Sequence, residues 1–326
     1  MTEERVSRRG YVKYVGGVVV AAVVAAAGYG IYEAIKPPPT TPTPTPTLTP
    51  TPTPTAPSVL VSVVKGTSAT SRRALIEKAL EPIGGMRKVL PPGSRVLVKP
   101  NVGFYDRDAT TEPDALSSMV EIVKKMNPEA LIVGDSSVRG YDTDTAIKNL
   151  GVQCRNLAED SVETLDIPNG VTIRKVSTYR TVRESTFIIG MPKLKRHSST
   201  MVTISLKNMM GVVTNDEKGR FHREGVDQSI ADLNSALKPN LVVIDATRVM
   251  TERGPTGGKM VELNTIIASL DPVAADLIAA ERLFALEGTS SPKDAADGIV
   301  HIQKAAELGV GFADRSKIKV FQATLD

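Results

Sequence analysis

The chain has 326 residues, of which 41% are hydrophobic and only 4% aromatic, so its length allows a large core built mainly from aliphatic side chains. The net charge of +4 includes Arg5, Arg8, Arg9 and Lys13 near the N-terminus, and the charge on the rest is too small to indicate a nucleic-acid-binding surface. A single cysteine, Cys154, excludes an internal disulfide, and it excludes an iron–sulfur cluster held by this chain alone.

Residues 1–36 have the pattern of a twin-arginine export signal. Arg8 and Arg9 precede Lys13, and an uncharged run rich in Ala, Gly and Val covers residues 14–32. This run is close to the ~20 residues that a helix needs to span a membrane, and the preceding positive charge favours a cytoplasmic N-terminus. We expect a single-pass membrane protein with its globular part outside the cytoplasm, or a secreted protein if the signal is cleaved. A plain signal anchor that contains two arginines is the alternative, and it gives the same location.

Residues 37–57 consist almost entirely of Pro and Thr. Because proline lacks an amide hydrogen and fixes φ, this segment is expected to be an extended stalk, either glycosylated or bare. It leads into a predicted globular domain over residues 58–326.

Short β-branched runs alternate with segments of helical periodicity in the globular part. The region 152–185 differs, because it has short β-like pieces and few helical stripes, and it is expected to be a β-rich insertion. Apolar strands separated by amphipathic helices predict an α/β fold with a mainly parallel sheet flanked by helices. Strands are expected at 59–64, 95–98, 130–133, 186–189, 241–244, 265–268 and 318–321, and helices at 71–83, 113–126, 202–210, 226–237, 272–286 and 292–308.

Polar residues follow several of the predicted strands at the point where each strand ends. Ligands of open α/β sheets bind beyond the carboxyl ends of the strands, so these residues are expected to meet at one edge. They comprise Lys99 and Asn101, Asp135 to Ser137, residues 193–199, Asp245 to Arg248, and Ser269 to Asp271.

The segment 193–199 is the richest of these, with two lysines, an arginine, a histidine and two serines. Such a segment suits a phosphate, carboxylate or sulfate group, and a helix beginning near Ser199 would add its N-terminal amides. We predict that Lys193, Lys195 and Lys207 bind a small anionic ligand. Asn208 lies beside Lys207 in the sequence, and Lys99 and Asn101 are placed at the rim of the site. A solvated charged loop is the alternative for this segment.

Proton transfer is assigned to His197 or Asp135. Asp135 and Asp245 have an alternative role as helix caps. The candidate ligands for a divalent metal are His197, His222 and Asp245, although no local spacing supports such a site.

The loop that contains Gly254 and Gly257 has two interpretations. Its glycines would allow close approach of the backbone to an anion, or the loop is a plain turn.

Several motifs follow one another along the globular part: Lys99-Pro100-Asn101, Thr111 with Pro113, Gly134-Asp135-Ser136, residues 192–197, Leu206-Lys207-Asn208 with Gly211, Lys218 with His222, Asp245-Ala246, residues 254–257, and residues 269–274 with Asp276. The order of these motifs resembles the family called domain of unknown function 362, which is associated with iron–sulfur proteins. The resemblance implies that the motifs form a shared site, and it agrees with export by a twin-arginine signal. Many relatives carry an added ferredoxin-like segment with cysteine-ligated clusters, which the single Cys154 indicates is missing here.

Three functional hypotheses remain open. The first is an enzyme that acts on a small anionic molecule or uses an anionic cofactor. The second is a tethered, non-catalytic binding protein, and the third is an accessory protein for an exported redox protein or metalloenzyme.

Overall fold

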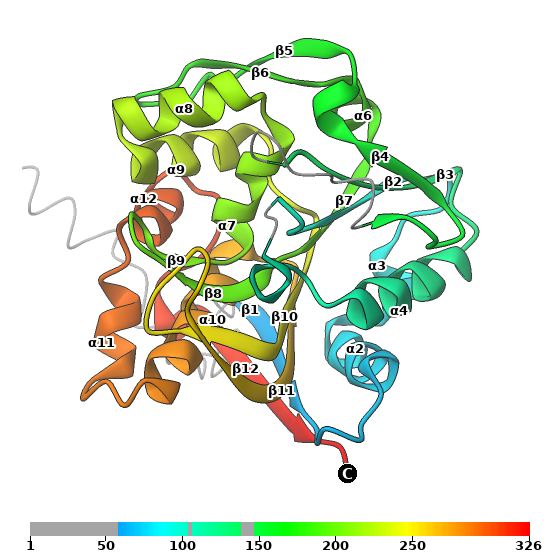
Figure 1. Cartoon of the computed structure of the whole chain (residues 1–326), viewed down its shortest axis with the longest axis vertical. Helices are drawn as coiled ribbons and strands as arrows, with labels where there is room; N and C mark the ends of the chain where they lie inside the picture. Colours follow the sequence, from blue (N-terminus) through cyan, green and yellow to red (C-terminus); the bar gives the residue numbers. More distant parts are fainter. Residues whose placement is uncertain (1–57, 104–105, 138–146) are drawn as a thin grey trace, which may run out of the picture. The chain divides into compact units, whose positions relative to one another are not determined.

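The computed structural model describes residues 58–103, 106–137 and 147–326 (Figure 1). The predicted signal helix and the Pro/Thr-rich stalk lie outside these residues. In the part of the chain that is described, no helix combines the length and the apolar character needed to cross a membrane.

A mixed sheet of ten strands organises the described residues. Its strands are β1 (Val59–Lys65), β2 (Arg95–Pro100), β3 (Ala130–Asp135), β4 (Gln153–Asn156), β7 (Phe187–Met191), β8 (Lys193–His197), β9 (Met201–Thr203), β10 (Leu241–Thr251), β11 (Lys259–Ser269) and β12 (Ile318–Thr324). The main path runs β12-β1-β11-β10-β7-β2-β3-β4, and β8 pairs with β10 and β9. Neighbouring strands are parallel except in the pairs β1–β11, β10–β11 and β8–β9. The prediction of a mainly parallel sheet is confirmed.

Helices pack on both faces of this sheet (Figure 1). On β10, Val242 and Ile244 belong to one hydrophobic core, and Leu241 and Val243 belong to the other, so alternate side chains are buried on opposite faces. The second core contains α2 (Arg72–Leu80), α3 (Met86–Val89) and α4 (Pro113–Lys124). The first contains α6 (Arg180–Glu184), α7 (Ser205–Asn208), α8 (Asn215–Glu224), α9 (Val226–Ala236), α10 (Pro272–Leu286), α11 (Pro292–Asp297) and α12 (Val300–Glu307).

The predicted β-rich insertion is present as a separate two-stranded antiparallel sheet, β5 (Val162–Asp166) with β6 (Lys175–Tyr179). The turn between them is held by the buried carboxylate of Asp232 on α9, which accepts the N–H groups of Val171, Thr172 and Ile173 at 2.7–3.0 Å. The preceding strand β4 instead joins the main sheet, parallel to β3.

The structure corrects the prediction for the segment 193–199. The sequence predicted a loop here and then a helix from residue 202. In the structure, Lys193–His197 form strand β8 and Met201–Thr203 form strand β9. Helix α7 begins only at Ser205, so no helix N-terminus lies at Ser199.

The expected position of the Ser269–Asp271 cluster is also wrong. Strand β11 runs antiparallel to both of its neighbours, which places its carboxyl end at the opposite edge of the sheet. There, the Asp271 carboxylate caps α10 by accepting the N–H groups of Val273 and Ala274, each at 2.9 Å.

Candidate functional site

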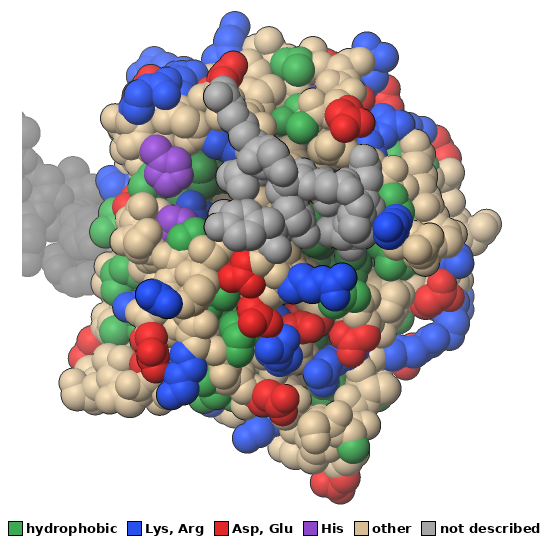
Figure 2. All heavy atoms as spheres, viewed as in Figure 1, with side chains coloured by type: hydrophobic (Ala, Val, Ile, Leu, Met, Phe, Trp, Pro, Cys, Tyr) green, Lys and Arg blue, Asp and Glu red, His purple; other side chains and the backbone are tan. Residues whose placement is uncertain are grey.

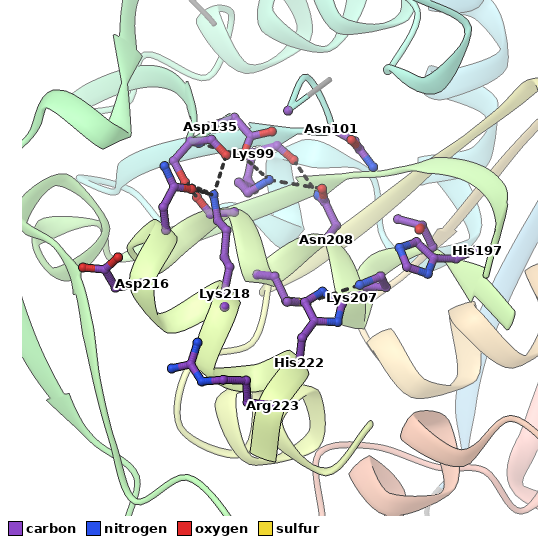
Figure 3. A pocket seen from close by; sticks show the side chains of 17 residues that line it. Lys99, Asn101, Asp135, His197, Lys207, Asn208, Asp216, Lys218, His222 and Arg223 are labelled. Atoms are coloured by element: carbon purple, nitrogen blue, oxygen red, sulfur yellow. Dashed lines mark hydrogen bonds and ion pairs between the residues drawn. The ribbon is translucent and has the colours of Figure 1, made fainter. Parts of the chain in front are cut away.

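A cavity of about 640 Å³ opens where strands of the main sheet end. Residues that follow or end β2 and β3 line one side, and residues of β8, β9, α7 and α8 line the others (Figure 3). The volume falls in the range of roughly 300–1,000 Å³ typical of small-molecule sites. We call it the strand-end cavity; its lining is Lys99, Asn101, Gly103, Asp135, Ser136, His197, Thr203, Lys207, Asn208, Met210, Gly211, Asn215, Asp216, Lys218, Gly219, His222 and Arg223.

Lys99 and Asp135 form a buried ion pair in this lining. Lys99 Nζ lies 2.7 Å from Asp135 Oδ1, and it also donates to the carbonyl oxygen of Pro100 and to Asn208 Oδ1 at 2.7 and 3.1 Å. Asp135 accepts two backbone N–H groups in addition. Burial lowers the pKa of Lys99, and Asp135 opposes that shift. Each hydrogen of the Lys99 ammonium therefore has an oxygen acceptor, and the pair joins the ends of β2 and β3.

Asn208 connects this ion pair to α7. Its Nδ2 donates to the carbonyl oxygen of Lys99 at 3.2 Å while its Oδ1 accepts from Lys99 Nζ. The two-point contact fixes the orientation of the amide, and it fixes the distance between β2 and α7. Asn101 also lines the cavity, and its backbone N–H donates to Thr111 Oγ1 at 2.9 Å.

Lys218 on α8 reaches the same region from the opposite side. Its Nζ donates to the carbonyl oxygen and the hydroxyl of Ser136 at 2.9 and 2.7 Å, and to Asn215 Oδ1 at 3.1 Å. Burial lowers the pKa of Lys218 to about 8, although Asp135 opposes the shift. The Lys218 ammonium is thus held by neutral oxygens, and its charge contributes to the potential inside the cavity.

Lys207 on α7 has a different environment. The hydrogen bond of its Nζ within the described residues goes to the thioether sulfur of Met210 at 3.4 Å, and no described carboxylate lies within ion-pair distance of it. Burial lowers the pKa of Lys207 to about 8, and the more distant Asp227 opposes the shift. A buried ammonium whose neighbour is a weak sulfur acceptor is poorly compensated.

His197 ends β8 at the same side of the cavity (Figure 3). Its Nδ1 accepts the backbone N–H of Ser199 at 3.1 Å, so the neutral ring carries its proton on Nε2. Burial, together with the positive charges of Lys207 and Lys195, lowers the pKa of His197 to about 3. The ring is therefore neutral near pH 7 and offers one N–H donor. His222 lines the cavity from α8, and burial and Lys207 lower its pKa as well.

Thr203 lies at the end of β9, in the wall of the cavity. Its side chain is only 4% exposed, and its hydroxyl has no hydrogen-bond partner within the described part of the chain. Buried hydroxyl groups without a partner are uncommon in folded proteins.

Asp276 positions α7, which carries Lys207 and Asn208. This fully buried carboxyl on α10 accepts the N–H groups of Ser205 and Leu206, each at 2.8 Å, at the start of α7. Burial raises the pKa of Asp276 to about 8, even though the two amides oppose the shift. Because α7 is a single turn, these two hydrogen bonds are a main restraint on where it begins.

Basic side chains outnumber acidic ones around the cavity. Lys99, Lys207, Lys218 and Arg223 face two carboxylates, Asp135 and Asp216. On the face shown in Figure 2, histidine side chains appear beside basic ones. The described lining is therefore positive overall, and its cationic donor groups outnumber its carboxylates.

Lys193 does not line the cavity, although it was predicted to bind an anion. Its fully buried Nζ lies 2.6 Å from Glu112 Oε1 and 3.3 Å from Asp245 Oδ2. Burial disfavours ionisation of Asp245, but Lys193 and hydrogen bonds from Thr247 and Glu112 lower its pKa below the ordinary value. The charge of Lys193 is thus used within the fold, where it ties β8 and β10 to the start of α4.

Lys195 is also absent from the lining. Its Nζ donates to the carbonyl oxygen of Ala109 at 2.6 Å, which attaches the loop before α4 to β8. Burial and the neighbouring Lys207 lower the pKa of Lys195 to about 7.

Gly254 and Gly257 lie in the turn between β10 and β11, outside the cavity lining. A Cβ on Gly254 would come within 1.8 Å of the carbonyl oxygen of Arg196, so this glycine is required by backbone packing. Gly257 has a φ of 66° and donates its N–H to Asp106 Oδ2 at 3.1 Å. The contacts support the interpretation of this loop as a turn.

The three candidate metal ligands do not meet. His197 and His222 line the cavity, whereas Asp245 is engaged with Lys193 and Thr247 outside it. No group of three or more His, Cys, Asp or Glu side chains suited to a metal ion occurs among the described residues. Of the three candidates, the structure brings together only His197 and His222 in the lining of the cavity.

The structure brings together seven of the predicted residues, namely Lys99, Asn101, Asp135, His197, Lys207, Asn208 and His222. The sequence analysis did not single out Thr203 or Arg223, and it named Lys218 only as part of a motif of the family resemblance. Helix α8 was not predicted, because Phe221 is its single fully buried residue and no apolar stripe marks it. The spacing of Lys218 and His222 was a usable signal, since residues i and i+4 share one face of a helix.

Three comparisons relate the chain to known proteins. The family model for domain of unknown function 362 (DUF362) matches residues 96–281, more than half of the chain. The thylakoid-associated protein sll1697 of Synechocystis sp. is 26% identical over 276 residues, covering 76% of this chain and 82% of that protein. The lactate racemase apoprotein of Thermoanaerobacterium thermosaccharolyticum is 14% identical with a TM-score of 0.42, covering 69% of this chain and 56% of that chain.

Proposed function

The chain belongs to the family of domain of unknown function 362, and from this premise we propose that it is an enzyme that acts on a small anionic molecule in the strand-end cavity. The family description names no reaction, so the proposal depends on the chemistry of the cavity. The anion binds beside Lys207, and the positive charges of Lys218 and Arg223 in the same lining favour its entry. The Lys99–Asp135 pair holds the ends of the strands in place.

The environment of Lys207 is the observation that carries the proposal. Transfer of an ammonium group out of water is costly unless a partner compensates its charge. The Lys99 ammonium has such a partner in Asp135, whereas Lys207 has the Met210 thioether. An anion in the cavity would supply the missing charge, and it would gain hydrogen bonds from a pre-positioned donor.

Two lysines of the cavity that can exchange a proton close to neutral pH support an enzyme over a simple receptor. The pKa of Lys207 and that of Lys218 are both lowered to about 8 by burial. General acids and bases work best when their pKa lies close to the working pH. Lys207 is the better candidate for this role, because the hydrogens of Lys218 are occupied by oxygen acceptors.

Lys207 fits proton transfer better than His197 or Asp135, the two residues to which the sequence analysis assigned this role. The low pKa of His197 makes its ring a hydrogen-bond donor near neutral pH and leaves little of it protonated. Both oxygens of Asp135 accept hydrogen bonds within the fold.

A non-catalytic binding protein is the second candidate, and one observation favours it. The buried carboxylate in the lining, Asp135, is saturated by Lys99 and backbone amides, so it does not offer a free base. In that case the protein binds an anion without converting it.

Ligand-dependent unfolding tests the proposal. The full-length protein is heated with a panel of small phosphates, sulfates and carboxylates, beside a Lys207→Met variant. A ligand present at a hundredfold excess over its Kd should stabilise the wild-type protein by about 2.7 kcal/mol. The same ligand concentration should stabilise the Lys207→Met variant by about half as much or less, because its affinity is at least about tenfold lower. Equal responses of the two proteins would contradict the proposal, and turnover of the stabilising ligand separates an enzyme from a receptor.

We also propose that the protein is exported through the twin-arginine route and either stays tethered or is released. The Arg8-Arg9 pair and the uncharged run after it support this, and a relative described as thylakoid-associated agrees with a membrane location. An Arg8→Lys/Arg9→Lys variant should accumulate in the cytoplasm. Unchanged export of this variant would exclude the twin-arginine route.

A further inference from the structure

The net charge of the side chains that line the strand-end cavity indicates which charge a ligand must carry to be compensated there. Lys99 is neutralised by Asp135 at 2.7 Å. The remaining charged side chains of the described lining are Lys207, Lys218 and Arg223 against Asp216, which leaves an excess of two positive charges. A carboxylate carries one negative charge, whereas a phosphate monoester carries nearly two at neutral pH, because its second pKa is about 6.

Hydrogen-bond donors on one side of the cavity indicate where the charged group of the ligand binds. Figure 3 shows His197, Lys207 and His222 on one side, away from Lys99 and Asp135. The ring of His197 has its proton on Nε2, since Nδ1 accepts from Ser199. Lys207 adds N–H donors whose partner among the described residues is a thioether.

Thr203 provides a third donor. Its buried hydroxyl has no partner among the described residues, and the residue lines the cavity four positions before Lys207. Three different side chains thus supply donors, and a phosphate monoester presents three terminal oxygens. A carboxylate has about four lone-pair sites and could also accept from three donors, so the charge of the lining, and not the number of donors, favours the phosphate.

We propose that the anion is the dianionic phosphate of a small phosphate monoester, bound by Lys207, His197 and Thr203. The inference rests on the proposed function and narrows its ligand class. The volume of about 640 Å³ exceeds what one phosphate group fills, so the rest of the molecule lies toward Lys218 and Arg223.

Isothermal titration calorimetry of the full-length protein tests this class. The probes are glycerol 3-phosphate, inorganic phosphate and acetate at constant ionic strength. At pH 7.5, glycerol 3-phosphate should bind about tenfold or more tightly than acetate, owing to its second charge. The Lys207→Met variant should lose about tenfold or more in affinity, and Thr203→Val about fivefold, the effect of one neutral hydrogen bond. A Lys259→Met variant, which changes an exposed lysine outside the cavity, is the matched control and should bind as the wild type does.

The pH dependence separates phosphate from carboxylate. Lowering the pH from 7.5 to 5.5 converts the phosphate dianion to a monoanion, so affinity for glycerol 3-phosphate should fall. Acetate stays ionised over most of this interval. Lys207 and Lys218 become more fully charged, and so does the neighbouring Lys195, whose pKa is about 7. The pKa of about 3 keeps the His197 ring neutral, and burial and Lys207 lower the pKa of His222 as well. A carboxylate ligand should therefore keep or gain affinity.

The outcomes distinguish a failure of the phosphate assignment from a failure of the anion site itself. Binding of acetate but not of phosphates, with dependence on Lys207, would overturn the phosphate assignment and keep the anion site. Absence of binding by every anion would overturn both. Phosphate binding that neither Lys207→Met nor Thr203→Val weakens would place the phosphate elsewhere, and thermal unfolding of each variant shows that it is folded.

Discussion

The backbone of Gly211 lies against the carboxylate of Asp135 so closely that a Cβ on Gly211 would be 2.1 Å from Asp135 Oδ1. The same Cβ would be 2.6 Å from Lys99 Nζ, so both members of the buried ion pair occupy the space. The Gly211 carbonyl also accepts the hydroxyl of Ser136 at 2.8 Å. Only glycine allows the chain after α7 to approach the ends of β2 and β3 in this way.

Replacement of Gly211 by alanine should therefore destabilise the protein. The added methyl group must displace a buried ion pair, and overpacking of this kind costs about 3 kcal/mol. Chemical denaturation measures the loss. Gly219→Ala, within α8 of the same cavity, is the control: among the described residues, its Cβ would meet only the flexible end of Arg223, at 3.3 Å. That variant should gain about 0.5–1 kcal/mol from helix propensity. Equal effects of the two substitutions would contradict the described packing.

Two buried lysines should respond in opposite ways to replacement by methionine. Lys193→Met leaves Asp245 buried without its cation and should cost about 3–5 kcal/mol of unfolding free energy. Lys207→Met removes a poorly compensated ammonium and should leave stability unchanged or higher. Urea unfolding of both variants checks this. A Lys193→Met protein that is as stable as wild type would show that the charge of Lys193 is not committed to the fold.

The stability of the ligand-free protein should rise with pH more steeply in the wild type than in Lys207→Met. The pKa of Lys207 is about 8 when folded, below the ordinary 10.5, so between these values the unfolded chain holds more protons. Unfolding free energy then increases with pH by up to about 1.4 kcal/mol per pH unit for this one group. Anion affinity should fall over the same interval, since the neutral amine binds anions weakly. Identical slopes in the two proteins would argue against a lowered pKa at Lys207.

The Lys99–Asp135 pair should show strong coupling in a double-mutant cycle. Asp135→Asn alone leaves the buried Lys99 ammonium without its carboxylate and should cost about 3–5 kcal/mol. In the Lys99→Met/Asp135→Asn protein the charge is gone, so the loss should be smaller than the sum of the two single changes. Urea denaturation of the four proteins gives the coupling energy, and additive losses would mean that the two groups act independently.

Sequence patterns predicted the elements whose signals are local. Helix α10 runs from Pro272 to Leu286 as expected, because Pro272 at the first position and the Asp271 cap mark its start. Helix α4 also begins with a proline, Pro113, at its first position, although the preceding Glu112 makes no side-chain cap. The strands buried on both faces were also found, since their apolar runs need no partner information to be recognised.

The buried position of the segment 193–199 could not be predicted from local sequence patterns. A run of charges normally indicates a solvated loop, but the lysines of β8 are buried with partners more than 50 positions away in the sequence, such as Glu112 and Asp245. Pairing at that separation cannot be derived from one sequence without an alignment. The gathering of Lys99, Asn101 and Asp135 could be predicted, because strand ends in a parallel sheet share an edge. The position of α8 could not be derived from periodicity, since that helix has no apolar stripe, although the spacing of Lys218 and His222 indicated that they share one face.

Anomalous diffraction from crystals soaked in selenate would locate the anion without knowledge of the natural ligand. Selenate is a tetrahedral dianion, and its selenium gives a signal that the protein atoms do not. We predict one strong peak in the strand-end cavity, within hydrogen-bond distance of Lys207 Nζ, which disappears in crystals of the Lys207→Met variant. A cavity without a peak, while selenate occupies other basic positions such as Arg253 or Lys259, would contradict the assignment of this cavity as the anion site.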